Sequence, residues 1–162
     1  MPAKVTLQLA RTRQQFEQAL QLLQISRERW GLESPAVNPH KLWLLKQHAL
    51  PSTNTIVALC NGEVVGSICL FGDSSFKLPS EARLNLRSFR DNLQGRLAEL
   101  SLPAIHSDFS SKADLLHALY HFALSFGTSF CKYDGFVTEA SEAWAFEYAR
   151  HLHFDSIFEP NE

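Results

Sequence analysis

The residue best suited to chemistry is Glu99, a single acidic side chain in an otherwise apolar run within the predicted strand 96–106. A carboxylate on a buried strand is costly unless it is paired or used in a reaction. Glu99 is therefore the first candidate for a catalytic residue. An ion pair with Arg96 or Arg87 that holds the fold together is the structural alternative.

Two histidines, His117 and His121, are four residues apart on one face of a predicted helix, which is the spacing of a metal-binding pair. Ala118 stands where a zinc protease has its glutamate. A third ligand is not close in the sequence, because the next histidines are His151 and His153. We therefore expect these histidines to be structural and predict no metal site.

The composition predicts one globular domain that spans residues 1–162. Hydrophobic residues make up 45% of the chain and charged residues 20%, which is typical of a folded protein rather than a disordered one. The net charge is −2 without a basic stripe, which disfavours a nucleic-acid partner. No apolar run approaches the ~18 residues of a membrane span, and the first residues show no secretion signal. Cys60, Cys69 and Cys131 are odd in number, so we expect buried free thiols and a cytoplasmic protein.

Hydrophobic periodicity predicts an α/β (α+β) fold with one mixed β-sheet flanked by helices. The strongest local signal is Asn61-Gly62, since both positions of such a hairpin turn need positive φ. The strand that follows this turn and the strand 96–106 are expected to be neighbours. The predicted strands are 5–9, 55–60, 63–71, 96–106 and 129–133 with 135–138, and residues 154–158 are expected to be a last short strand or a tail. The predicted helices are 12–30, 41–48, part of 80–93, 115–126 and 142–152.

The helix 115–126 has signals at both ends. Ser111 and Asp114 have the spacing of a Ser-x-x-Asp capping box before it. Gly127 follows its last apolar residue and is expected to end it.

Four segments, taken in order, resemble a known family. The hairpin is followed by Val64-Val65-Gly66-Ser67, by Asp73-Ser74-Ser75 with Leu78-Pro79, and by Gly95-Arg96-Leu97-Ala98-Glu99-Leu100-Ser101. The segment 147–154 is similar to the GNAT pattern Phe-Tyr-x-Arg-x-Leu-Gly-Phe, with His153 in place of the glycine. Over about residues 14–158, this order and spacing resembles the N-acyl amino acid synthases, relatives of the acyl-homoserine lactone synthases in the GNAT acyltransferase superfamily.

The resemblance implies a GNAT-like enzyme that moves an acyl group from a thioester to an amine. The donor would be a fatty acyl chain on acyl carrier protein or on coenzyme A, the acceptor an amino acid or similar amine, and no cofactor would be tightly bound. Glu99 would be the general base, and Tyr148 the acid that protonates the leaving thiolate. The thioester arm would lie where the strand 99–105 splays from 131–138, and its phosphate at a helix start. The implied binding residues are Leu100, Ser101, Leu102 and Ala104 for the arm, and Ser110, Ser111, Lys112 and Ala113 for the phosphate.

Several departures from the family pattern bear on the substrates. Asp108 stands where GNAT proteins usually carry a basic or amide residue, and Ser111 replaces a glycine, which disfavours coenzyme A more than a carrier protein. Cys69 and Leu102 stand where the lactone synthases have arginines, which argues against S-adenosylmethionine as the acceptor. The sequence stops at Glu162, so we expect the usual C-terminal β-hairpin of the fold to be lacking.

These departures favour an alternative, a non-catalytic GNAT-like module that binds an acyl thioester or a protein partner. A third reading is a small acetyltransferase that uses acetyl coenzyme A. The acceptor, the acyl chain length, the pathway and a homodimer are left open by the sequence.

Overall fold

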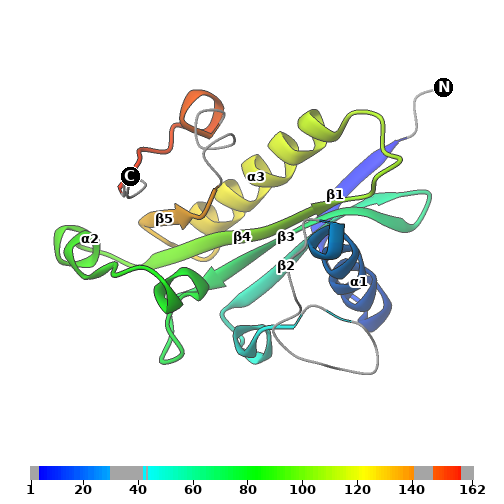
Figure 1. Cartoon of the computed structure of the whole chain (residues 1–162). Coiled ribbons are helices and arrows are strands. Elements are labelled where there is room, and N and C mark those ends of the chain that lie inside the picture. The colour runs from blue at the N-terminus through cyan, green and yellow to red at the C-terminus, as the bar shows by residue number, and fades with distance from the viewer. Residues whose placement is uncertain (1–3, 30–41, 43, 141–147, 158–162) are drawn as a thin grey trace.

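The computed structural model describes residues 4–29, 42, 44–140 and 148–157, which form a five-stranded β-sheet with helices on both faces (Figure 1). The strands lie side by side in the order of the sequence. Neighbouring strands are antiparallel from β1 to β4, whereas β5 runs parallel to β4. The sheet is therefore mixed, as predicted. The strands are β1 (Val5–Leu9), β2 (Thr53–Cys60), β3 (Glu63–Gly72), β4 (Leu97–Ile105) and β5 (Gly135–Thr138).

The turn between β2 and β3 is the one that the sequence predicts. Asn61 and Gly62 adopt φ values of 53° and 87°. Such a two-residue turn matches the right-handed twist of the strands that it joins. The hairpin thereby fixes β3 beside β2. On its other edge β3 pairs with β4, so the prediction that these two strands are neighbours is confirmed.

Two long helices, α1 (Arg13–Arg29) and α3 (Lys112–Ser129), cover opposite faces of the sheet (Figure 1). We call the buried apolar side chains on the two faces the α1 layer and the α3 layer. Alternation along β4 places Leu97 in the α1 layer and Leu100 in the α3 layer. Shorter helices are η1 (Lys46–Ala49), η2 (Pro79–Ala82) and α2 (Arg87–Asn92). None of the described helices is long and apolar enough to cross a membrane.

Helix α3 is longer than predicted, and its start differs in detail. It runs from Lys112 through Gly127 to Ser129, so the glycine does not end it. A Cβ atom at Gly127 would come within 2.6 Å of the Phe136 ring on β5, so glycine here allows the helix to lie close against the sheet. Ser111 is the N-cap residue, but its side chain makes no capping hydrogen bond, so the predicted capping box is wrong.

The predicted helix 41–48 is replaced by the single 3-10 turn η1 among the residues described there. The Gln47 carbonyl accepts hydrogen bonds from the Leu50 N–H at 3.0 Å and from the Thr53 hydroxyl at 2.6 Å. Both bonds turn the chain into β2, so the helix cannot continue.

One predicted strand near the end of the chain is wrong, and the segment expected to be a last strand or a tail is not a strand in its described residues. The predicted strand 129–133 does not form, because Ser129 still belongs to α3 and Lys132 has a φ of 58°, which breaks the extended run before β5. Residues 154–157 are not a strand either. His153 has a φ of 57°, and the Phe154 N–H turns back to the Tyr148 carbonyl at 3.4 Å. Residues 148–152 are helical as predicted, whereas residues 142–147 of that predicted helix and residue 158 lie outside the described residues.

Candidate active site

Strands β4 and β5 pair over only part of their length, and we call the place beyond Leu100 and Thr138, where their pairing stops, the opening. Their register ends at Leu100 opposite Thr138, while β4 continues to Ile105. Within the described chain, no strand pairs with the segment 101–105 on the β5 side. This is the place where the family resemblance implies that two central strands splay apart.

An irregularity in β4 lies at this opening. Between the pairs Ser67–Ala104 and Cys69–Ser101, one residue of β3 faces two residues of β4, which is a β-bulge. Leu102 in the bulge has a φ of 56°, a backbone conformation that leucine rarely adopts. Backbone strain of this kind is concentrated at functional sites.

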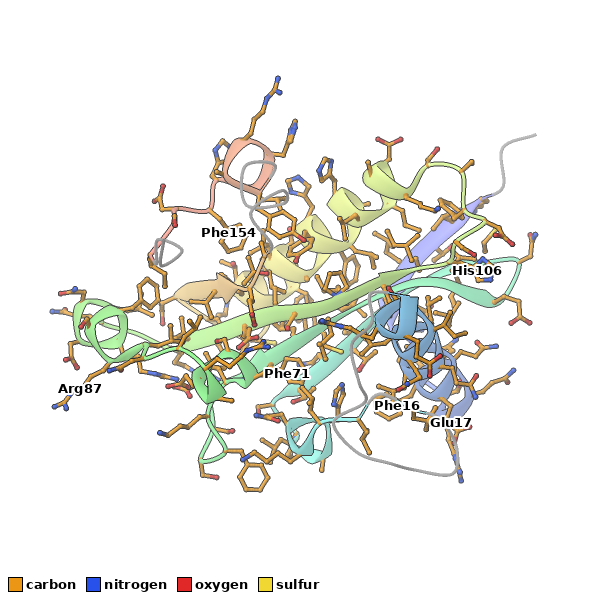
Figure 2. The ribbon with its side chains drawn as sticks, in the orientation of Figure 1. Phe16, Glu17, Phe71, Arg87, His106 and Phe154 are labelled. Atoms are coloured by element: carbon orange, nitrogen blue, oxygen red, sulfur yellow. The ribbon has the colours of Figure 1, made fainter. Side chains whose placement is uncertain are left out.

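Glu99 lies one residue before the end of the β4–β5 ladder and is only 1% exposed. Its side chain is on the face of the α1 layer, because its cross-strand partner is Phe71, whose ring lies on that side in Figure 2. The carboxylate oxygen Oε2 accepts two hydrogen bonds from Ser80, one from the backbone N–H at 2.9 Å and one from the hydroxyl at 2.8 Å. The other oxygen, Oε1, has no hydrogen-bond partner among the described residues. Glu99 therefore has a free acceptor position.

Neither arginine of the structural alternative pairs with Glu99. Arg96 donates to the Cys131 carbonyl at 2.6 Å and lies over the Tyr133 ring, and Arg87 is 4.0 Å from Asp91. Burial raises the pKa of the Glu99 carboxyl, and the hydrogen bonds from Ser80 with a contribution from Ser101 oppose this only in part. A carboxyl whose pKa is raised towards neutrality is suited to accept and release protons.

Tyr148 lies on the other side of the sheet, in the α3 layer, and is 5% exposed. Its hydroxyl oxygen accepts a hydrogen bond of 3.2 Å from Tyr120, a fully buried residue of α3. The Tyr120 hydroxyl is also 3.2 Å from the hydroxyl of Thr138, where β5 and its pairing with β4 end. Burial raises the pKa of Tyr148, and the hydrogen bond from Tyr120 opposes that effect. Three hydroxyl groups thus lie together near the end of the β4–β5 pairing.

The residues predicted to bind the phosphate lie together at the start of α3. Ser110, Ser111, Lys112 and Ala113 are all exposed there, next to the unpaired N–H groups of the first helical turn. Asp108 is exposed two residues earlier, and its backbone N–H donates to His106 Nδ1 at 3.3 Å. The segment offers helix N–H groups to an anion, with two exposed carboxylates near it, Asp108 before the helix and Asp114 in its first turn.

The remaining candidates stay outside this site. The rings of His117 and His151 are 5.0 Å apart, but no group of three metal-ligating side chains occurs among the described residues. Cys69 is buried, with its sulfur 3.5 Å from His48 Nε2, whereas Cys60 and Cys131 are only partly buried, contrary to prediction. All three cysteines are free thiols, as predicted.

Two residues at the site were missed from the sequence, Ser80 and Tyr120. Ser80 directly follows Leu78-Pro79, a segment that carries the family resemblance, and this position could have indicated that Ser80 is close to the site. Tyr120 is one of many apolar or aromatic residues in its predicted helix, and nothing in the sequence distinguishes it from a core residue.

Comparison with known proteins identifies the family. The model of the N-acyl amino acid synthase FeeM matches residues 18–162, most of the chain. The chain belongs to this family. No curated protein sequence matches it significantly. The resemblance predicted from the sequence is therefore confirmed.

Solved structures show the fold of the FeeM-family chain. The structure of FeeM, an N-acyl amino acid synthase from uncultured soil microbes, matches with a TM-score of 0.76 at 16% identity, over 92% of this chain and 78% of that one. An acetyltransferase from Trypanosoma brucei matches with a TM-score of 0.62 at 14% identity, over 98% of both chains. Glucosamine-6-phosphate N-acetyltransferase from Arabidopsis thaliana matches with a TM-score of 0.64 at 10% identity, over 98% of this chain and 97% of that one. The sheet and its helices thus have the GNAT fold, and membership of the FeeM family makes the chain an N-acyltransferase.

Proposed function

We propose that this N-acyltransferase moves a fatty acyl group from the thioester of acyl carrier protein, or of coenzyme A, to the amino group of an amino acid or a similar amine. The observation that carries the proposal is the position of Glu99. Its buried carboxyl has one oxygen without a partner among the described residues, and it lies where β4 separates from β5. Membership of the FeeM family supports the choice of acceptor.

The first step is removal of a proton from the acceptor ammonium. Ser80 holds Oε2 with two hydrogen bonds and so fixes the carboxylate, while Oε1 is left to receive the proton. The neutral amine then attacks the thioester carbonyl carbon. The raised pKa of Glu99 helps here, because a base whose pKa is closer to that of the ammonium takes its proton more readily.

The second step stabilises the charge that forms on the carbonyl oxygen. Backbone N–H groups of β4 at the opening are fixed by the strand and are suited to donate to this oxyanion. Leu102 in the bulge would supply such an N–H group, because those of Ser101 and Ala104 face β3 in the ladder and Pro103 has none. The same segment, from Leu100 to Ala104, would bind the amides of the thioester arm.

The third step protonates the sulfur as the carbon–sulfur bond breaks. Tyr148 is the proposed acid, since its hydroxyl lies on the α3 side of the same opening, next to Tyr120 and Thr138. Its raised pKa keeps the proton on the hydroxyl until a thiolate forms.

The start of α3 favours a carrier-protein donor. Ser110, Ser111, Lys112 and Ala113 offer helix N–H groups and one positive charge, which suits the single phosphate of a carrier-protein arm. The several phosphates of coenzyme A would meet more repulsion than a single phosphate from the exposed carboxylates of Asp108 and Asp114. A cytoplasmic location and a single domain over residues 1–162 remain predictions.

The test is a binding screen by native mass spectrometry. The purified chain is incubated with acyl carrier protein charged with acyl chains of several lengths, and separately with the matching acyl-coenzyme A set. We expect retention of the long-chain carrier protein, and preference for acetyl coenzyme A would support the small acetyltransferase instead. Retention of no thioester would contradict the proposal.

A pair of variants tests the role of Asp108. Asp108→Asn should increase retention of acyl-coenzyme A more than retention of acyl carrier protein. Asp91→Asn, a change of the same chemistry on α2, serves as the matched control and should leave both unchanged. Equal effects of the two substitutions would contradict the proposed electrostatic role of Asp108.

A further inference from the structure

An ion pair links the two segments that flank Glu99. Arg83 is the C-cap residue of η2, the turn whose Ser80 donates to the Glu99 carboxylate. Glu139 directly follows β5, the strand that pairs with β4 up to Leu100. The Arg83 guanidinium donates through Nη2 to Oε2 of Glu139. The pair thus joins η2 to the end of β5 beside the opening.

The strand register places Glu139 on the same face of the sheet as Glu99. Glu99 is opposite Val137, which belongs to the α1 layer, and Thr138 contacts helix α3 on the other face. Side chains alternate along an extended chain, so Glu139 is directed back to the α1 face. Burial is the main reason that the pKa of Glu99 is raised, and the negative charge of Glu139 raises it further. Glu139 is therefore close enough to Glu99 to influence its protonation.

A second arginine lies near this ion pair. Arg27 is in the last turn of α1 and is partly buried. Burial lowers the pKa of Arg27, the negative charge of Glu139 opposes that shift, and the positive charge of Arg83 adds to it. Exposed charges act on one another in this way only over short distances, so the three side chains are close together. Two positive charges and one negative charge thus lie at the α1 side of the opening, which favours a ligand with a carboxylate.

Arg83 is suited to bind a second carboxylate while it holds Glu139. The two side chains are 69% and 41% exposed, and exposed ion pairs contribute little to stability, so a ligand can compete for the arginine. A guanidinium has five N–H donors, and the bond to Glu139 uses one of them. Arg90 shows the same capacity in this protein, since it binds Asp73 and Glu81 together.

We propose that Arg83 determines the acceptor specificity of the acyl transfer, by binding the carboxylate of an amino acid and placing its amino group at Oε1 of Glu99. This inference rests on the proposed function, in which Glu99 is the base. It narrows the acceptor to a free α-amino acid and disfavours amines that lack the carboxyl group. Arg27 adds positive charge nearby, and Glu139 holds Arg83 beside the opening before the acceptor binds.

The structure of an amino acid gives such an arginine its task. In an α-amino acid the carboxylate and the ammonium are attached to one carbon, so fixing the first restricts the position of the second. Turn η2 carries both Arg83 and Ser80, and the Arg83 N–H donates to the Ser80 carbonyl at 3.0 Å. One turn would thereby position the acceptor and the base relative to each other. Arg83 exchanges no proton and forms no covalent bond in the reaction, so its effect falls on binding of the acceptor.

The test compares amino acids with amines that lack only the carboxyl group. The acceptor pairs are leucine with isopentylamine and phenylalanine with phenethylamine, each combined with the thioester that the binding screen selects. Arg83→Gln should lower kcat/KM for the amino acid about 10- to 100-fold, the value of hydrogen bonds to a charged group, mainly by raising KM. The matching amine should change little. Arg83→Lys keeps the charge but loses the planar fork of donors, so it should lie between Arg83→Gln and the wild type.

Two further variants control for charge and for position. Arg87→Gln removes an exposed arginine of α2, which is 4.0 Å from Asp91, and it should leave the preference for amino acids unchanged. Glu139→Gln removes the competing carboxylate, so the ratio of kcat/KM for amino acid over amine should rise. An ion pair with a structural role alone predicts the same change for Arg83→Gln and Glu139→Gln. The unfolding midpoints of both variants should stay close to that of the wild type, because the pair is exposed.

The outcomes separate this inference from the proposed function. An unchanged preference in Arg83→Gln, or an equal loss with amino acid and amine, would overturn the role of Arg83 while leaving the acyltransferase reaction intact. A wild type that acylates the amine as efficiently as the amino acid would do the same. Transfer to no acceptor of either kind would contradict the proposed function, and the inference with it. If Arg83→Gln folds poorly, Glu139→Gln tests the same pair from its other side, and an unchanged ratio there counts against the inference.

Discussion

Replacing Glu99 with glutamine is the most direct test of the active site. Glutamine has the shape of glutamate, and its carbonyl oxygen can still accept the two hydrogen bonds from Ser80. Its NH₂ group then takes the position of Oε1, which has no partner within the described part of the chain. The substitution therefore removes the charge and the ability to take a proton while leaving the packing in place.

The structure gives an expected size for both consequences. A general base contributes about 10²- to 10⁴-fold to the rate, so turnover by Glu99→Gln should fall by that factor. The buried carboxylate also lowers the stability of the native state, because one of its oxygens is desolvated without compensation. An unsatisfied buried polar group costs about 1–3 kcal/mol, and more if it is charged. At alkaline pH the variant should therefore be more stable than the wild type by about 1 kcal/mol or more, since the NH₂ group keeps part of that cost.

The pH dependence of this difference has a definite sign. The pKa of Glu99 is raised in the folded state above the ordinary value of 4.5. Below that ordinary value the carboxyl is protonated in both states, and the wild type carries no charge penalty. As the pH rises from there through the folded pKa, the unfolded state loses its proton more readily, so the wild type loses stability. Glutamine does not titrate, so the difference between variant and wild type should grow across this window and then level off.

The assay combines acyl-transfer rates with thermal unfolding of both proteins at a series of pH values. Glu81→Gln is a control that should change the stability in the opposite direction. Burial raises the pKa of Glu81, but its ion pair with Arg90 and its hydrogen bond from the Leu78 N–H outweigh burial and lower that pKa overall. Glu81→Gln should therefore destabilise the protein at neutral pH, lose that effect in acid, and leave turnover unchanged.

Two results would refute the reasoning about Glu99. Wild-type turnover by Glu99→Gln would remove Glu99 as the base. A loss of stability that is equally large at every pH would show that the Glu99 side chain is needed for packing. It would also show that burial of its charge does not destabilise the folded state.

Two further predictions concern other parts of the chain. Burial raises the pKa of the Cys69 thiol to about 12, so iodoacetamide at neutral pH should modify Cys60 well before Cys69, as read by peptide mass spectrometry, and equal rates would contradict the burial of Cys69. Lys132 is exposed and has a φ of 58°. This conformation costs a non-glycine residue about 1–2 kcal/mol, and replacement by glycine removes that cost. The greater freedom of glycine in the unfolded chain takes back about 0.4–1 kcal/mol of the gain. Lys132→Gly should therefore raise the unfolding midpoint slightly, and a lower midpoint would show that the lysine side chain is needed there.

The parts of the fold that follow local rules could be predicted from the sequence. Asn61-Gly62 gave the hairpin because few other residue pairs tolerate two positive φ values in succession. Glu99 could be assigned to a buried strand because the residues around it are apolar. In both cases the physical reason lies within a few neighbouring residues.

The errors arose where a distant contact decides the local structure. Gly127 has the appearance of a helix end, but it is needed because Phe136 of β5 lies against it. Ser80 is 19 residues from Glu99, and Tyr120 is 28 residues from Tyr148, so their hydrogen bonds depend on how η2, β4, α3 and the last helical segment pack together. Sequence periodicity predicts which face of an element is buried, but it does not predict which polar group meets another across elements.

The geometry of β4 would allow the proposed site to hold both a base and an acid. The Glu99 side chain is on the α1 face of the sheet, where Ser80 donates to it, whereas Tyr148 is on the α3 face. A base and an acid on the same face would exchange their protons or pair with each other. Here the strand separates them, and the opening beyond Leu100 and Thr138 is where both faces meet. A thioester carbonyl in that opening would have the amine and Glu99 on one side and its sulfur and Tyr148 on the other. The strained backbone at Leu102 is consistent with this arrangement, because the bulge bends β4 at the point where its pairing with β5 stops.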